Sequence, residues 1–277
     1  MIGCFKYDIY SQGTDISGGK HTGIFVGFSL GPSQSLVDNE GTPAVSKLMS
    51  GKMNSSSGSV ETGYLFSRYF GISSGIGFIS YNTQVTLASY QNNLNIKDSE
   101  NESYELRVSA ADVKEIQKVS SLSIPFCFIF HIPFTETFVL FLEPGLNISV
   151  PLNKEFKTSG TFTYKGYYPA YNVILENLPA YNFPSDKSSN SEGELELKKY
   201  WVSTVASAGI DFFIQRKIQI TAGVCYTRSL SNISQYTSTD QFQLSTAPGQ
   251  LNSLMGGTTK VTTSSMGLKI SLRYYLK

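Results

Sequence analysis

The chain has 277 residues and a formal net charge of +1, from 22 basic and 21 acidic side chains. This balance gives no reason to expect nucleic acid or a strongly anionic surface as a partner. Charged residues make up 16% of the chain and aromatic residues 13%, with 24 glycines. A composition poor in charge and rich in aromatic residues and glycine favours β structure over helix.

Eight segments alternate apolar side chains with small or polar ones, which is the pattern of strands with two different faces. In chain order they cover residues 22–31, 59–68, 72–87, 121–130, 138–150, 201–214, 218–227 and 264–275. The third segment is ambiguous, because Ile76 and Phe78 oppose Ile79 and Tyr81.

Short and long connections alternate between these segments. Tight turns lie around residues 69–71, 131–136 and 215–217, whereas the connections at 32–57, 91–118, 153–200 and 231–261 are long. Soluble sandwiches and lipocalins have no reason to sort connections in this way. Bacterial outer-membrane barrels do, with short periplasmic turns and long extracellular loops.

The face opposite the apolar stripe carries mostly small residues, where a soluble sheet would carry Lys, Glu and Thr. These are Gly23, Gly27, Ser29, Gly63, Ser67, Ser121, Ser123, Gly145, Ser149, Ser203, Ser207, Gly209, Gly267 and Ser271. Small side chains suit the narrow interior of a barrel of about eight strands. We therefore expect the apolar stripe to face lipid and the small residues to face the lumen.

Aromatic residues near the predicted strand ends resemble the two girdles of a membrane barrel. By the short turns and the C-terminus lie Tyr69, Phe70, Phe134, Phe212, Phe213, Tyr274 and Tyr275. By the long connections lie Tyr90, Tyr200, Trp201 and Tyr226.

Residues 119–135 carry no charge, which also allows a transmembrane helix, but the segment is short for one and contains Pro125 and Pro133. Alternation favours a strand. Pro125 and Pro144 each remove a hydrogen-bond donor from the sheet, so we expect a shared bulge where they lie on neighbouring strands.

Five charged residues share the lumen-facing parity: Glu61, Glu143, Asp211, Lys269 and Arg273. Charges in a narrow lumen must pair or lose their charge. We expect Glu143 to pair with Lys269 or Arg273, and Asp211 to join Arg273. A structural plug of ion pairs is the favoured interpretation, and a proton path or gated pore is the alternative.

The sequence offers no catalytic motif. Outer-membrane hydrolases need a histidine with serine or acidic partners, but we expect both histidines, His21 and His131, at the periplasmic edge, His131 in a tight turn. No nucleophile elbow, zinc-protease motif or phosphate-binding glycine loop occurs, and the cysteines lack metal-ligand spacing. We expect no enzymatic activity, no cofactor and no metal.

The third long connection is rich in aromatic residues and repeats Pro-Ala-Tyr-Asn at 169–172 and 179–182. Its aromatic residues include Phe162, Tyr164, Tyr167, Tyr168, Tyr171, Tyr181 and Phe183. Tyrosine and asparagine on a rigid loop make good contacts with proteins or glycans, so the five tyrosines are candidate surface contacts. The alternative is that these rings cap the barrel mouth.

Two motifs resemble the outer-membrane β-barrel family common in Bacteroidetes, with its PorT-like and OmpX-like eight-stranded barrels. Leu122-Ser123-Ile124-Pro125-Phe126 is similar to the family's L-x-I-P-L, and Phe141-Leu142-Glu143-Pro144-Gly145 to its L-x-A-G-P, although Glu-Pro-Gly replaces the usual small-Gly-Pro order. The final strand at 266–275 is also similar. The resemblance implies fold and membrane, and most members have no assigned role.

We predict an all-β chain: an eight-stranded antiparallel up-and-down barrel at 22–277, embedded in outer-membrane lipid, after a periplasmic extension at 1–21. Such a protein is exported, yet residues 1–5 lack the regions of a signal peptide, so we expect the signal peptide to be missing from this sequence. The predicted role is surface interaction or a subunit of an envelope or secretion complex. A small solute pore or transporter and a soluble lipid-binding β-barrel are alternatives.

Overall fold

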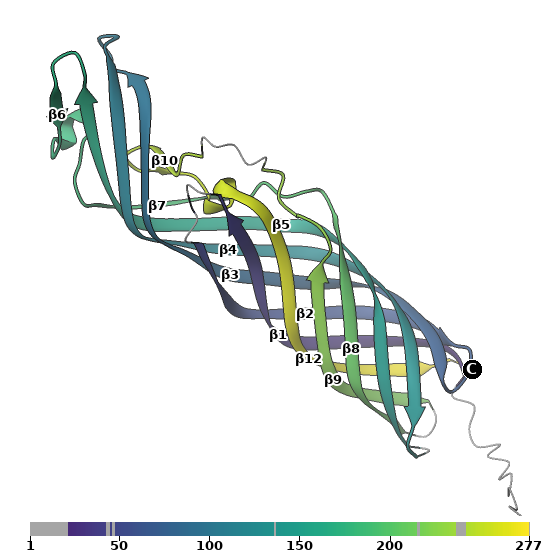
Figure 1. Ribbon diagram of the computed structural model, residues 1–277. Helices are drawn as coiled ribbons and strands as arrows, with labels where there is room; N and C mark the ends of the chain where they lie inside the picture. The colour runs from purple at the N-terminus through teal and green to yellow at the C-terminus, as the bar shows by residue number, and fades with distance from the viewer. Residues whose placement is uncertain are drawn as a thin grey trace, which may run out of the picture.

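The computed structural model describes residues 22–42, 45, 48–135, 137–214, 217–236 and 242–276. Eight long strands form a closed antiparallel ring (Figure 1). They are β1 (Gly23–Gly41), β2 (Leu48–Leu65), β3 (Phe70–Lys97), β4 (Ser103–Pro133), β5 (Phe138–Tyr168), β8 (Trp201–Ile214), β9 (Ile218–Ser229) and β12 (Thr258–Tyr275). Each pairs with the next long strand, and β12 pairs with β1. The predicted eight-stranded up-and-down barrel is confirmed.

The lower wall of the barrel, toward the short turns, is covered by exposed apolar side chains. On β1 these are Ile24, Val26, Phe28 and Leu30, each between 43% and 55% exposed. Their neighbours on β12 are Met266, Leu268, Ile270 and Leu272. Continuous apolar rows of this size are rare on water-facing surfaces, and they match the lipid-facing belt of a membrane barrel. We call this part of the wall the lipid-facing band.

The ambiguous third strand follows the same rule as its neighbours. Ile76 and Phe78 are 61% and 43% exposed and belong to the lipid-facing band, whereas Tyr81 is fully buried in the interior. Residues 119–135, for which a helix was the alternative, lie mainly in β4. Within the described residues, no helix has the length and apolar character needed to cross a membrane.

Six of the eight strands continue well beyond their predicted outer ends, whereas β8 and β9 keep close to the predicted bounds. β3 ends at Lys97 and β4 begins at Ser103. Only residues 98–102 therefore connect them, and not the predicted 91–118. β5 likewise continues to Tyr168. The alternation was missed because residues 91–95 read Gln-Asn-Asn-Leu-Asn, with polar side chains on both faces.

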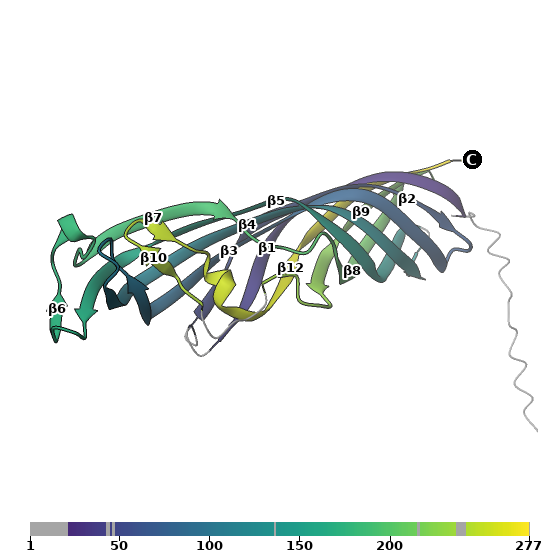
Figure 2. The same cartoon turned by 90° about the horizontal axis from the view of Figure 1, so that it is seen from above.

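These outer strand ends form a sheet that projects past the barrel mouth (Figures 1 and 2). We call residues 88–112 and 160–186 the extension. It includes β6 (Val173–Leu175), which pairs with the end of β5, and the short 3₁₀ helix η2 (Pro179–Tyr181). β7 (Lys187–Glu194) returns along β5 toward the barrel.

The shared bulge predicted at Pro125 and Pro144 is wrong. β4 and β5 keep one register from Ser121↔Pro151 to Pro133↔Val139, across both prolines. Pro125 opposes Asn147, and the nearest register shift falls between Ser120 and Ser121. The prolines therefore fit the sheet without an inserted residue.

Three apolar clusters occupy the interior at successive heights. Beside the short turns lie Phe25, Leu65, Ile129, Val139, Phe213 and Tyr275. A second cluster, around Tyr81, Val119 and Trp201, lies beyond the lipid-facing band. A third fills the mouth and the base of the extension, where the β9–β12 connection folds inward with β10 (Ser245–Ala247), β11 (Gln250–Leu251) and η3 (Leu254–Gly257).

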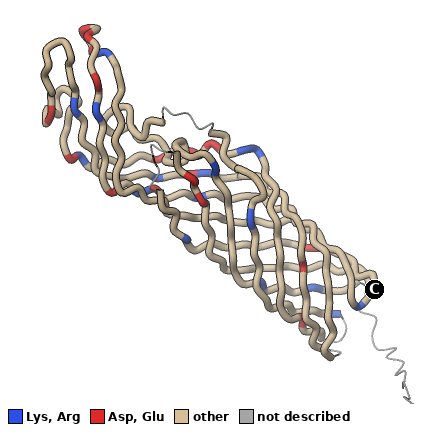
Figure 3. Tube along the Cα trace, viewed as in Figure 1, with Lys and Arg blue, Asp and Glu red and all other residues tan. Residues whose placement is uncertain are grey.

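These clusters correct part of the predicted aromatic girdles. Phe213, Tyr275, Tyr90 and Trp201 are at most 6% exposed and belong to the interior, because their parity turns them inward. The exposed members are Tyr69, Phe70, Phe134, Tyr274, Tyr200 and Tyr226. Charged residues gather on the extension and the mouth, whereas they are sparse along the barrel wall (Figure 3).

Candidate functional site

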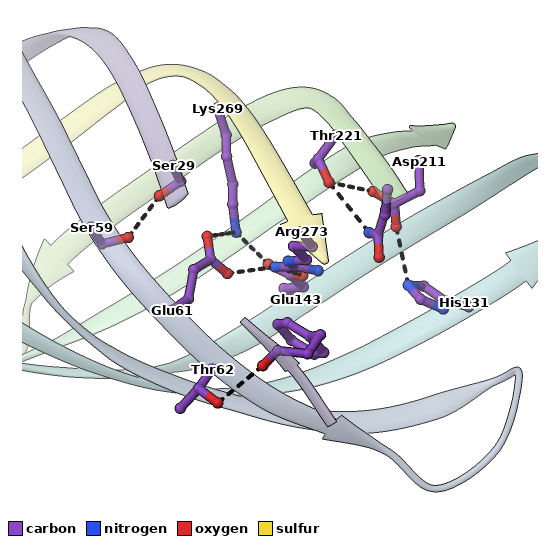
Figure 4. A network of polar contacts seen from close by, with 12 residues as sticks. Ser29, Ser59, Glu61, Thr62, His131, Glu143, Asp211, Thr221, Lys269 and Arg273 are labelled. Carbon is purple, nitrogen blue, oxygen red and sulfur yellow. Dashed lines mark hydrogen bonds and ion pairs between the residues drawn. The ribbon is translucent and has the colours of Figure 1, made fainter. Parts of the chain in front are cut away.

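Four of the five predicted lumen charges form one buried network between the first apolar cluster and the middle of the barrel (Figure 4). Arg273 Nη2 lies 2.7 Å from Glu61 Oε2 and 2.6 Å from Glu143 Oε1. Lys269 Nζ lies 2.5 Å from Glu143 Oε2 and 3.9 Å from Glu61 Oε1. Two cations thus face two carboxylates, so the group carries no net charge.

Strand parity and one glycine assemble this network. Lys269 and Arg273 share the inner face of β12, and Gly27 of β1 lies between Glu61 and Arg273 in the ladder. A Cβ atom on Gly27 would meet Arg273 Cγ at 2.8 Å, so glycine leaves room for the arginine stem. The guanidinium also lies 4.8 Å from the ring centre of Phe25. Glu61, Glu143 and Arg273 are buried and the Lys269 side chain is only 14% exposed, so removing Arg273 or a carboxylate would leave an uncompensated charge.

Asp211 does not join this network as predicted. Its Oδ2 lies 3.0 Å from His131 Nε2, and its Oδ1 accepts a hydrogen bond of 2.6 Å from Thr221. No ion pair joins Asp211 to Arg273 in the part of the chain that the structure describes. The prediction that His131 lies in a tight turn is wrong: it belongs to β4 and is only 4% exposed. Its side chain therefore points inward and is the partner of Asp211 in place of Arg273. The other histidine, His21, lies outside the described residues.

Small polar residues surround a cavity of about 110 Å³ above the ion pairs. Its lining includes Ser29, Ser59, Ser73, Ser123, Asn147 and Ser207, together with Glu61, Glu143 and Lys269. Ser29 and Ser59 share a hydrogen bond of 2.6 Å, and Ser123 and Asn147 one of 2.5 Å. Above this cavity the second apolar cluster fills the interior again.

A buried carboxylate that the sequence analysis missed holds the inward-folded β9–β12 connection. Glu115 of β4 is fully buried and accepts hydrogen bonds from Gln117 at 2.7 Å and Thr158 at 2.6 Å. It also accepts the Ser253 hydroxyl at 2.9 Å and the Leu254 backbone N–H at 2.7 Å. Burial raises the pKa of this carboxyl. Extending the β4 alternation outward from Val119 would have placed Glu115 inside.

The candidate surface tyrosines separate into two groups. Tyr164 is fully buried, and its hydroxyl lies 2.7 Å from the Ser245 hydroxyl, so it belongs to the cap over the mouth and not to the surface. Tyr167 is partly exposed, with the Arg107 guanidinium 4.5 Å from its ring centre. Tyr171 and Tyr181 are 61% and 70% exposed at the outer end of the extension.

A cleft of about 650 Å³ opens between the β3–β4 turn and the segment from the end of β5 to η2. Tyr168, Tyr171 and Tyr181 line it together with Asp98, Glu100 and Glu102. Among the described residues, no group of three or more His, Cys, Asp or Glu side chains is placed to hold a metal ion.

Comparison with known proteins supports the membrane-spanning barrel that the geometry suggests. The outer membrane protein beta-barrel domain family matches residues 11–235. The comparison with curated proteins gave no significant match.

Three solved bacterial structures are similar to this chain over most of its length. Neisserial surface protein A shares 9% identity, with 91% of this chain and 97% of that chain covered and a TM-score of 0.37. The outer membrane protein OprG from Pseudomonas aeruginosa shares 13%, with coverage of 93% and 98% and a TM-score of 0.34. Ail of Yersinia pestis, solved with a heparin analogue, shares 12%, with coverage of 91% and 99% and a TM-score of 0.31.

The family match extends over most of the chain and agrees with a closed eight-stranded ring that has an apolar outer wall. Outer-membrane localisation is therefore confirmed, and a soluble lipid-binding barrel is wrong. The chain belongs to the outer membrane protein β-barrel domain family.

Proposed function

We propose that this protein is a closed barrel that presents its extension for interaction at the cell surface, on its own or as a subunit of an envelope complex. The proposal rests on a contrast between the charged side chains inside the barrel and those on the extension. Inside the barrel the charges are paired and buried. On the extension, charged and aromatic side chains are exposed beyond the lipid-facing band.

A small pore or transporter is the weaker alternative. Arg273 and Glu143 are at most 1% exposed and the apolar clusters fill the interior on both sides of them. Ion conduction needs a wet path, and barrels of about eight strands have interiors that side chains just fill. These features favour a filled lumen as a structural plug over a gated path.

The resemblance to PorT-like barrels extends the proposal toward assembly. In that case the extension contacts other envelope proteins, including secretion components, and the chain has no enzymatic activity of its own. Membrane lipid around the band and a protein or glycan at the extension are then its partners.

The test is binding by intact cells. Bacteria displaying the full chain are applied to an array of host and envelope proteins and glycans, beside a variant in which the β3–β4 turn at 98–102 and the segment 169–182, with β6 and η2, are replaced by Gly-Ser linkers. We expect wild-type cells to bind at least one class of target and the variant to lose most of that binding. Tyr200→Ala serves as control, because Tyr200 is 65% exposed but lies outside the extension. Equal binding by the linker variant, or no binding by wild-type cells, would contradict the proposal.

A further inference from the structure

The cleft at the outer end of the extension is an open cavity between two separate parts of the chain. Its walls come from the β3–β4 turn, the start of β4, the end of β5, β6 and η2. Its volume of about 650 Å³ is in the range of small-molecule and side-chain binding sites. The positive φ angles of Asn101, Asn172 and Asn182 form the tight turns around it.

Four tyrosines provide aromatic surface in this cleft. Tyr104 and Tyr168 stack with ring centres 5.0 Å apart and planes 12° apart, which fixes the inner wall. Tyr171 and Tyr181 are exposed and complete the lining. The edge-on contact of Phe183 with Tyr104, at 5.8 Å, anchors the inner wall to the apolar cluster below. An aromatic surface of this kind is available to a ligand, because the fold does not bury it.

Three carboxylates also line the cleft, and two of them hold its rings and turn. Asp98 Oδ1 accepts the backbone N–H groups of Glu100 and Glu102 at 2.9 Å, and its Oδ2 accepts the Tyr168 hydroxyl at 3.2 Å. Glu102 Oε1 accepts the Tyr171 hydroxyl at 2.6 Å. The backbone N–H of Glu102 lowers the pKa of Asp98, so this carboxylate keeps its charge at neutral pH.

Among the described residues, no cation forms an ion pair with the carboxylates of this cleft. None of its lining residues is Lys or Arg. The nearest lysine in sequence, Lys97, donates to Asn101 at 2.9 Å. Two other acids on the extension do have cationic partners: Glu105 lies 2.9 Å from Arg107, and Glu176 lies 2.5 Å from Lys165. The cleft is therefore a local negative site lined by aromatic rings.

A divalent metal does not suit this arrangement. Metal sites need several carboxylate oxygens converging on one point, and no described group of acidic residues does so. Asp98 and Glu102 already accept hydrogen bonds from their own turn and tyrosines. A diffuse organic cation suits it better, because aromatic faces attract ammonium and guanidinium groups and nearby carboxylates add to that attraction.

We propose that this cleft binds an organic cation, either a free alkylammonium compound or the lysine or arginine side chain of a partner protein. The inference rests on the proposed surface role and names its chemistry. The uncompensated carboxylates also favour a cation over an anionic glycan, since like charges would repel each other.

The test compares two ligands of equal shape and different charge. The full chain in dodecyl maltoside, which carries no choline, is titrated with choline and with its neutral isostere 3,3-dimethyl-1-butanol, and binding is followed by saturation-transfer NMR. We expect choline to bind about tenfold more tightly, with weakening as salt rises. A basic peptide, Gly-Lys-Gly-Arg-Gly, is titrated in parallel: tighter binding than choline assigns the cation to a protein partner, and weaker binding to a small molecule.

Variants locate the site. Tyr181→Ala is expected to weaken choline binding about fivefold, whereas Tyr181→Phe keeps the ring and the affinity. Glu100→Gln should weaken it too. Tyr200→Ala and Glu194→Gln are matched controls outside the cleft and should leave it unchanged. An unchanged heat-modifiability on gels shows that each variant is folded.

Several results would overturn the proposal. Choline and its isostere would bind equally, or Tyr181→Ala would leave choline affinity unchanged. A neutral oligosaccharide would bind with the same affinity in wild type and in Glu100→Gln, or micromolar calcium would displace choline. If the choline titration fails but the linker variant still loses cell binding, the cation chemistry alone is refuted. If the choline titration fails and the linker variant binds like wild type, the proposed surface role is refuted as well.

Discussion

The barrel and the extension use charged residues in opposite ways. In the barrel, Glu61, Glu143, Lys269 and Arg273 neutralise one another away from water. On the extension, ion pairs are exposed, and the carboxylates of the outer cleft have no cationic partner among the described residues. The comparison teaches that polarity inside this barrel fills space and specifies the fold, whereas polarity outside it is available to a partner.

The largest effect should come from Arg273→Met, which leaves Glu61 and Glu143 with Lys269 alone. Breaking a buried ion pair by removing one partner costs about 3–5 kcal/mol. The free energy of unfolding is measured by urea titration in detergent micelles, with the shift in apparent size on gels as a second readout. Arg228→Met is the matched control, because Arg228 is exposed. Equal stability of the two variants would mean that the network does not stabilise the barrel.

Glu115→Ala should have an intermediate effect, at the border of barrel and extension. It leaves four donors without their acceptor, which costs on the order of 1–3 kcal/mol. We expect faster hydrogen exchange at the backbone amides of Leu254 and Met255, because η3 loses its anchor. Glu194→Ala, at a side chain 78% exposed, should leave these amides protected. Protection equal to wild type in Glu115→Ala would show that the connection packs without its anchor.

The same carboxyl predicts a pH dependence. Burial raises the pKa of Glu115 in the folded protein. A carboxyl with a raised folded-state pKa contributes fully to stability below its unfolded-state pKa, and this contribution is lost as pH rises through the folded-state value. The thermal midpoint of wild type relative to Glu115→Gln should therefore fall from acidic to neutral pH. A constant difference between the two proteins across this range would contradict the assignment.

The smallest effect should come from Lys165→Ala on the extension. Lys165 lies 2.5 Å from Glu176, but the side chains are 41% and 53% exposed. Exposed ion pairs contribute about 0–1 kcal/mol. We expect an unfolding midpoint close to that of wild type in 0.5 M salt and a slight loss at low salt. A loss comparable to that of Arg273→Met would remove the contrast between the two regions.

The sequence predicts the barrel well because period-two alternation is strong where one face meets lipid. The lipid-facing side of the first strand is clear from its alternating apolar residues, Ile24, Val26, Phe28 and Leu30. The small residues opposite them indicate a narrow lumen. The same alternation brought Glu143, Lys269 and Arg273 to one side of the sheet, where the structure joins them.

The extension was missed because water on its surface imposes no such pattern. Gln91, Asn93 and Asn95 alternate with Asn92, Leu94 and Ile96, so few apolar residues mark the inner face. Tyr164 could not be distinguished from Tyr171 by composition, since its burial depends on β10 folding back from a distant part of the chain. His131 was misplaced because strand β4 continues to Pro133, beyond the point where the sequence suggested a turn.

Ion conductance across a planar bilayer tests the filled barrel most directly. Purified protein is inserted into a membrane in 1 M KCl, and current is recorded over a range of voltages, with a known porin as positive control for insertion. The filled interior predicts no discrete current steps from correctly folded, heat-modifiable protein. Stable ohmic steps that grow in Arg273→Met would contradict the account and make the lumen a path instead of a plug.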